Sequence, residues 1–137
     1  MTAEAAAVAG VPRVLLRVEG AALFALATLV YARTGTSWWI YAMLFLAPDL
    51  TFLGYLAGPR LGAFAYNAAH TTLAPIALGT IGYVVAAPIA ISLALVWAAH
   101  IGLDRVLGYG LKYSTGFAFT HLGRIGRPDR EGPMIVS

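Results

Sequence analysis

Four long runs of apolar residues, broken only by isolated polar positions, dominate the chain. A helix needs about 20 residues to cross a bilayer core of about 30 Å. The runs that approach this length cover Val11–Tyr31, Trp38–Leu56, Leu61–Gly79 and Val84–Leu107. Turn residues separate the first three runs, at residues 34–37 and 58–59. The stretch between the third and fourth runs is itself apolar and contains no clear turn signal. The end of the third run is therefore defined only to within about four residues. The pattern therefore predicts four membrane-spanning helices.

The basic residues predict the orientation of these helices. Eight of the nine Lys and Arg residues fall on one predicted side of the membrane, and Arg33 falls on the other. Because cytoplasmic loops carry an excess of positive charge, both termini are expected in the cytoplasm. Short loops make consecutive helices antiparallel neighbours. The predicted fold is all-α, an integral membrane four-helix up-down bundle.

The segment that follows the fourth run differs in composition. Residues 108–126 combine several glycines with aromatic and basic residues, and they are too short and polar for a fifth span. We expect either an interfacial helix or a folded cap on the cytoplasmic side. Residues 127–137 resemble a polar tail with little intrinsic order. The predicted organisation is a transmembrane domain with an interfacial cap over residues 1–126, followed by the tail.

Composition narrows the function classes. Among 137 residues, 60% are hydrophobic and 11% are charged, which excludes an ordinary water-soluble globule. The basic residues are scattered instead of forming a stripe, so no nucleic-acid partner is expected. The chain has no cysteine, and any metal site must therefore use nitrogen and oxygen ligands.

Five ionisable residues lie inside or at the end of the apolar runs: Glu19, Asp49, His70, His100 and Asp104. Such groups are costly at bilayer depth, at least about 2.5 to 3.5 kcal/mol each, and usually mark a functional site. At 1.5 Å per residue, the first four lie about 9 to 15 Å from the cytoplasmic ends of their helices. The topology thus predicts one polar layer to which every helix contributes.

The spacing of these residues indicates which of them can act together. Asn67 and His70 share a helix face, as do His100 and Asp104, and Tyr66 lies four residues before His70. Carboxylate and imidazole without thiolate are ligands of Zn, Fe or Mn.

The sequence gives the following assignments, with a divalent metal as the expected cofactor. The predicted metal ligands are Asp49, His70, His100 and Asp104; the candidate catalytic residues are Glu19 and Asp49; the supporting residues are Tyr66, Asn67 and His121. Arg105 and Lys112 are predicted to anchor at lipid headgroups, with phosphate binding as the alternative for both.

Other interpretations stay open from the sequence. Polar residues in lipid often hydrogen-bond only to hold helices together, at about 0.6 kcal/mol each. The protein would then be a non-enzymatic accessory or scaffold subunit of a larger membrane complex, or a homo-oligomer. A proton or ion pathway is a third possibility. If the site is catalytic, hydrolysis or oxidation of a lipid-soluble small molecule is the expected reaction class.

Several short polar motifs stand in a recognisable order. They are Leu16–Gly20, Pro48–Leu50, Leu53–Tyr55, Tyr66–Thr71, Ala99–Arg105 and Leu107–Tyr113. From about Val14 to Gly126 the chain resembles a bacterial family of small membrane proteins, domain of unknown function 4260. The resemblance implies a multi-pass protein of the bacterial inner membrane and implies no activity. The recurring polar positions of the family correspond to Glu19, Asp49, Asn67, His70, His100 and Asp104.

Overall fold

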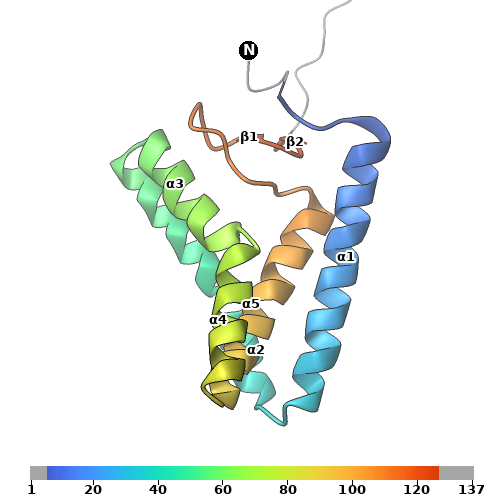
Figure 1. Ribbon diagram of the computed structural model, residues 1–137. Coiled ribbons are helices and arrows are strands. Elements are labelled where there is room, and N and C mark those ends of the chain that lie inside the picture. Colours follow the sequence, from blue (N-terminus) through green and yellow to red (C-terminus); the bar gives the residue numbers. More distant parts are fainter. Residues whose placement is uncertain (1–5, 127–137) are drawn as a thin grey trace, which may run out of the picture.

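The computed structural model describes residues 6–126, which are mostly helical (Figure 1). The predicted polar tail, residues 127–137, lies outside the described residues. The helices are α1 (Gly10–Arg33), α2 (Trp38–Leu44), the 3₁₀ helix η1 (Ala47–Ala57), α3 (Pro59–His70), α4 (Leu73–Val84) and α5 (Pro88–Leu107); two short antiparallel strands follow, β1 (Phe119–Thr120) and β2 (Gly123–Arg124).

Helices α1 and α5 form the most regular part of the molecule and lie side by side (Figure 1). Glycines allow their close approach. A methyl group at Gly102 would lie 2.6 Å from the backbone nitrogen of Phe24 and 2.7 Å from the carbonyl oxygen of Gly20. Because those neighbours are backbone atoms, no side-chain movement could relieve the clash. This contact fixes where α5 stands relative to α1.

The second predicted span is divided into an α-helix and a 3₁₀ helix. Pro48 has no N–H to donate to the carbonyl of residue 44, where α2 ends. The backbone N–H of Asp49 instead donates to the carbonyl of Leu46 at 3.1 Å, and the tighter 3₁₀ geometry continues to Ala57. The proline therefore changes the direction of the backbone next to a carboxylate.

The third predicted span is also interrupted. Helix α3 ends at His70, and Thr71 adopts an extended conformation before α4 begins at Leu73. Pro75 has no N–H that could bond to the carbonyl of Thr71, so a continuous helix would lose a hydrogen bond here. Helix α4 continues to Val84 and not to Gly79, and α5 begins at Pro88. The boundary predicted in the weakly marked stretch was therefore too early.

The apolar surface is that of a membrane protein. Among residues 6–126, three segments are long and apolar enough to cross a bilayer: α1, the combined segment Trp38–Ala57, and α5. Helix α4 is apolar but shorter. Large apolar side chains cover the outside, and Leu29, Met43 and Leu56 are 67%, 78% and 87% exposed. Exposed apolar surface on this scale fits contact with lipid. The up-down bundle of four spans stays a prediction.

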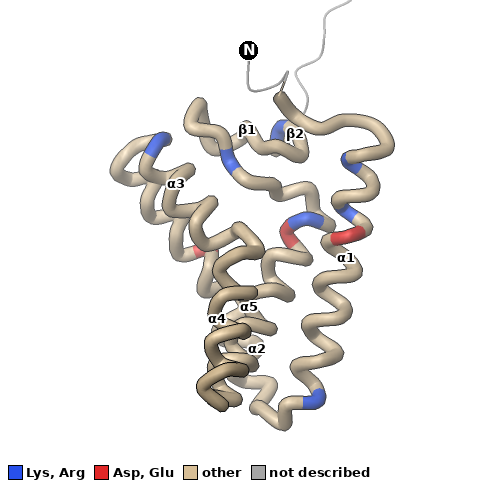
Figure 2. The backbone as a smooth tube through the Cα atoms, viewed as in Figure 1, with Lys and Arg blue, Asp and Glu red and all other residues tan. Residues whose placement is uncertain are grey.

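Residues 108–126 form a folded cap, which is one of the two alternatives predicted from the sequence. No helix occurs between residues 108 and 126, so the interfacial-helix alternative is wrong. The cap lies where α1 begins and α5 ends (Figure 1). The backbone N–H of Val8 donates to the carbonyl of His121 at 2.8 Å. Figure 2 shows basic residues gathered toward this end, with one basic position at the far end of α1, which closes with Arg33.

Candidate metal centre

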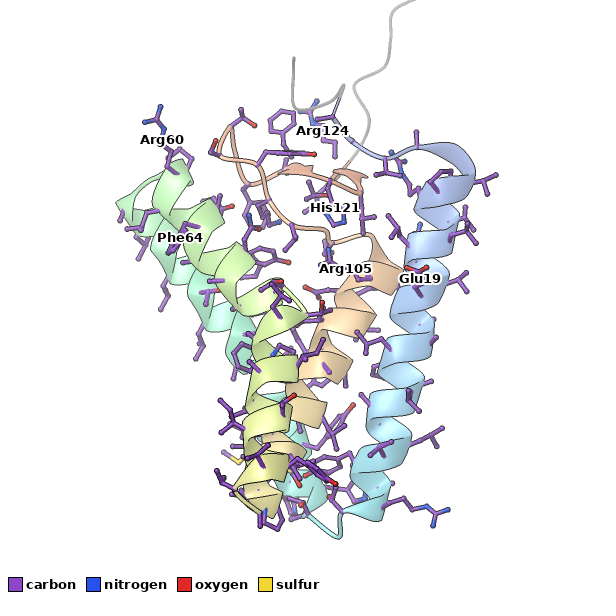
Figure 3. The ribbon with its side chains drawn as sticks, in the orientation of Figure 1. Glu19, Arg60, Phe64, Arg105, His121 and Arg124 are labelled. Atoms are coloured by element: carbon purple, nitrogen blue, oxygen red, sulfur yellow. The ribbon has the colours of Figure 1, made fainter. Side chains whose placement is uncertain are left out.

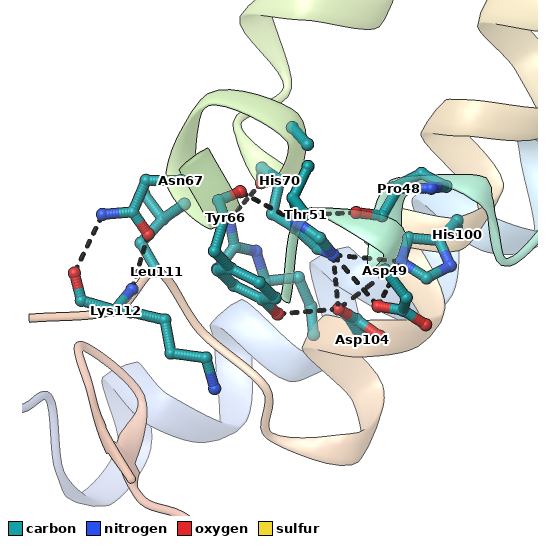
Figure 4. A network of polar contacts seen from close by, with 12 residues as sticks. Pro48, Asp49, Thr51, Tyr66, Asn67, His70, His100, Asp104, Leu111 and Lys112 are labelled. Carbon is teal, nitrogen blue, oxygen red and sulfur yellow. Dashed lines mark hydrogen bonds and ion pairs between the residues drawn. The ribbon is translucent and has the colours of Figure 1, made fainter. Parts of the chain in front are cut away.

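Four side chains from three helical elements meet below the cap. Asp49 comes from the beginning of η1, His70 from the end of α3, and His100 and Asp104 from successive turns of α5 (Figure 4). The two interruptions of the helices supply two of these residues, Asp49 directly after Pro48 and His70 directly before the break. The four ligand atoms all lie within 4.8 Å of one another.

The distances between these atoms are short and similar. Nε2 of His70 lies 3.1 Å from Nε2 of His100, 3.4 Å from Oδ1 of Asp49 and 3.5 Å from Oδ2 of Asp104. Nε2 of His100 lies 3.4 Å from Oδ1 of Asp49 and 3.7 Å from Oδ2 of Asp104. A tetrahedral metal that binds nitrogen and oxygen at about 2.0–2.1 Å holds its ligands about 3.3–3.4 Å apart. These five separations bracket this edge length, and the two carboxylate oxygens lie within 4.8 Å of each other.

Tyr66 orients two of the four side chains. Nδ1 of His70 lies 2.8 Å from the Tyr66 carbonyl oxygen, which can only accept a hydrogen bond, so this nitrogen is the donor. The lone pair of the neutral ring is then on Nε2, which faces the cluster. The Tyr66 ring stacks on the His70 ring at 3.6 Å and 11°, and its hydroxyl donates to Oδ2 of Asp104 at 3.0 Å. A fixed imidazole tautomer of this kind is typical of metal ligands.

The imidazoles are buried, and the carboxylates border a cavity. His70 and His100 are each 2% exposed, whereas the side chains of Asp49 and Asp104 are 32% and 14% exposed. The cavity has a volume of about 270 Å³. Its walls are Asp49, Asp104, Phe52, Tyr66, Tyr109, Lys112, Phe117 and Ile125. A small molecule in this cavity would contact the carboxylate side of the cluster.

The structure does not bring Glu19 into the cluster. Glu19 is exposed on α1 (Figure 3), and the group of four possible ligands does not include it. The neighbouring Gly20 faces α5, since a methyl group there would overlap the Cβ of Arg105. Consecutive residues point about 100° apart around a helix, so Glu19 points away from the face of α1 that contacts α5. The prediction used depth along the helix and did not include this rotation.

Asn67 and His121 hold the cap and do not touch the cluster. The Asn67 amide accepts from the backbone N–H of Lys112 at 2.6 Å and donates to the Lys112 carbonyl at 2.8 Å. Nδ1 of His121 accepts from the backbone N–H of Leu111 at 2.8 Å. Burial and the nearby Arg105 cation lower the pKa of His121, which favours this neutral accepting ring. Both residues support the site through the cap that covers it.

Two residues predicted to anchor at lipid headgroups lie near the site instead. Nη2 of Arg105 donates to the carbonyl of His70 at 3.2 Å, at the end of α3. Lys112 is only 4% exposed, and burial lowers the pKa of its ammonium to about 8. In the sequence both follow the last apolar run like ordinary anchors. Lys112 is buried because the cap folds back over the site. The local sequence pattern does not predict this burial.

Residues 13–125 match the family described as Domain of unknown function (DUF4260). The chain belongs to this family. The resemblance found in the sequence motifs is thereby confirmed. No curated protein and no solved structure matches the chain. Since the family description assigns no activity, the chemistry of the site has to be inferred from its geometry.

Proposed function

We propose that this protein is a membrane metalloenzyme that holds one divalent metal ion between Asp49, His70, His100 and Asp104. The observation that carries the proposal is the set of four ligand atoms, two nitrogens and two oxygens, within 4.8 Å of one another. The five separations that involve an imidazole nitrogen, 3.1 to 3.7 Å, are close to the edges of a tetrahedron around an ion.

The surroundings of the carboxylates support a cation at this position. Across residues 6–126, neither Asp49 nor Asp104 has an ion pair with lysine or arginine; their charged contacts are with the two imidazoles. Lys112 and Arg105 act on these carboxylates only from beyond ion-pair distance, so the two partly buried carboxylates have no directly paired cation, which is costly. A divalent ion would supply that positive charge and would bind all four ligand atoms of the cluster.

Zinc is the metal that this donor set favours, ahead of iron and manganese. Two imidazole nitrogens and two carboxylate oxygens at tetrahedral separations suit zinc, whereas manganese prefers a shell of six oxygen-rich ligands. Zinc acts as a Lewis acid and makes water a stronger nucleophile at neutral pH. Hydrolysis is therefore the reaction class that we propose.

The proposed substrate is a lipid-soluble molecule. An apolar cavity of about 420 Å³ lies next to the cluster, and its lining includes Pro48, Ala69, Val96 and Trp97. Pro48 and Ala69 directly precede the ligands Asp49 and His70. A substrate dissolved in lipid could approach along this surface. Four protein ligands would fill a tetrahedral shell, so hydrolysis would require Asp49, the more exposed carboxylate, to leave the metal; water would take its place and Asp49 would accept a proton from that water.

The proposed location is the bacterial inner membrane, with four crossings and both termini in the cytoplasm. In this arrangement the segment from α3 to α4 makes the third crossing, and the lipid bilayer is the main partner. The concentration of basic residues at the cap end supports this orientation. A homo-oligomer or a larger membrane complex remains compatible with the exposed apolar surface.

Metal content tests the proposal. We expect the protein, purified without a polyhistidine tag, to contain close to one metal ion per chain by elemental analysis. His70→Ala and His100→Ala should each lose it, while Glu19→Gln, the matched control for an acidic residue outside the cluster, should keep it. Metal-free protein of unchanged thermal stability would refute the proposal and would favour a scaffold in which the polar residues only hold the helices together.

A further inference from the structure

The ammonium group of Lys112 lies among aromatic rings at one wall of the cavity. Its Nζ is 3.9 Å from the centre of the Phe117 ring, 4.8 Å from that of Tyr66 and 5.8 Å from that of Phe52. Figure 4 shows Lys112 and Tyr66 side by side, with the Tyr66 hydroxyl reaching Asp104. Aromatic faces attract a cation, but they leave its three N–H donors without an acceptor.

The Lys112 side chain is largely buried, and its ammonium borders the cavity without a polar partner in the described part of the chain. Lys112 is 4% exposed, and within the described part of the chain its Nζ makes neither a hydrogen bond nor an ion pair. The position is held by the backbone, because Asn67 bonds both the N–H and the carbonyl of Lys112. Three unused donors therefore lie at the wall of a cavity of about 270 Å³ that is also lined by Asp49 and Asp104.

Charge balance indicates what the cavity lacks. A divalent ion in the cluster would neutralise the carboxylates of Asp49 and Asp104. Arg105, the other cation near them, donates to the carbonyl of His70. Lys112 would then be a buried positive charge without a counter-charge, which is unfavourable unless an anion binds.

We propose that Lys112 binds an acidic group, a carboxylate or a phosphate, on the small molecule that this cavity accepts. The proposal rests on the proposed function and specifies its substrate class. The rest of the molecule would be apolar, since Phe52, Phe117 and Ile125 form the remaining wall. At about 270 Å³ the cavity is slightly smaller than the usual range of ligand pockets, about 300–1,000 Å³, so the ligand is small.

A single-site label can test this directly, because Lys112 is the only lysine of the chain. Protein labelled with ¹³C-lysine gives one lysine ε-carbon signal, which can be followed in detergent micelles. We would titrate it with phenylacetate and with phenylphosphonate, and use phenylacetamide as a neutral control of similar size. We expect both acids to shift the signal in a saturable manner and the amide to leave it in place. Equal effects of acid and amide, or no effect of the acids, would overturn the proposal.

Two variants exclude an indirect effect. Lys112→Met removes the charge and keeps the backbone bonds to Asn67, so the cap should stay folded. By calorimetry we expect phenylacetate to bind at least about tenfold more weakly to Lys112→Met. Lys112→Arg should retain most of the affinity. Unchanged affinity in Lys112→Met would show that the acid binds elsewhere and would contradict the proposal.

Titrations of metal-free and zinc-loaded protein separate this inference from the proposed function. A protein that binds no zinc but shows the acid-dependent shift would refute the metal site and leave the anion site standing. A protein that binds one zinc ion without responding to the acids would support the metal site and refute the anion site. We expect both to bind, with tighter binding of the acid when zinc is present.

Discussion

The contact between α1 and α5 and the junction of η1, α3 and α5 are built in opposite ways. The first joins two long, regular helices whose glycines, Gly20 and Gly102, bring the backbones together. The second joins a 3₁₀ helix to a helix that stops at His70. The group of four possible metal ligands found among residues 6–126 lies entirely at the irregular junction.

This contrast separates two tasks of the molecule. A continuous apolar helix forms all the hydrogen bonds of its backbone N–H and C=O groups internally. It needs only small residues at the contact to pack closely against another helix in lipid. A cluster of ligands must converge on one point, which is easier where the backbone changes direction. Helix α5 takes part in both regions: Gly102 faces α1, while His100 and Asp104 face the junction. Changes in the first region should therefore affect stability, and changes in the second should affect binding.

The largest effect is expected from Gly102→Ala. The added methyl group would lie 2.6 Å from the backbone nitrogen of Phe24, so the two helices would have to separate. We expect a loss of about 3 kcal/mol in the free energy of unfolding. The matched control is Gly79→Ala on α4, whose methyl group would meet only the Cβ of Ala94, at 3.3 Å. Equal stability of both variants, measured by denaturant titration in micelles, would show that the α1–α5 contact is not tightly packed.

Asn67→Ala should act on the cap. It removes two hydrogen bonds to the Lys112 backbone and leaves those backbone groups unsatisfied. We expect a local loss of about 2 kcal/mol, visible as faster amide exchange in residues 108–126. Arg60→Gln, an exposed change on the same helix, is the control. Unchanged exchange in Asn67→Ala would mean that other contacts hold the cap.

Tyr66→Phe should weaken metal binding while leaving the fold intact. The substitution removes the hydroxyl that donates to Asp104 and keeps the ring that stacks on His70. We expect about a tenfold loss in zinc affinity, as is usual for partners of metal ligands. Tyr55→Phe is the control, because its buried hydroxyl has no hydrogen-bond partner in the described structure. If the two variants bound zinc equally well, the Tyr66 hydroxyl would have no role in the site.

The smallest effect concerns the pH dependence of the cap. The pKa of His121 is lowered below its ordinary value of 6.5, so the folded protein favours the neutral ring. As the pH falls through 6.5, the unfolded chain gains a proton that the folded one resists, and stability decreases. His121→Asn should reduce this decrease when thermal midpoints at pH 7.5 and 5.5 are compared. Identical pH dependence in the two proteins would assign the effect to other groups.

Much of this organisation could be predicted from the sequence. The apolar runs located α1 and α5 within a few residues, since long stretches of one type leave a strong signal. The free-energy cost of placing ionisable residues in a bilayer pointed to Asp49, His70, His100 and Asp104 as candidates, and the structure places these four together. The rotation of Glu19 and the burial of Lys112 could not be predicted. The first depends on which face of α1 meets α5, and the second on how the cap folds back; both are set by tertiary contacts.

X-ray absorption at the edge of the bound metal is the most direct test of the central claim. We predict a four-coordinate ion with two imidazole nitrogens and two carboxylate oxygens at about 2.0–2.1 Å, as expected for zinc. The imidazole scattering should halve in His100→Ala if that variant is saturated with excess metal. A six-coordinate shell of oxygen atoms without imidazole scattering would contradict the proposed centre and would indicate a metal bound adventitiously at the surface.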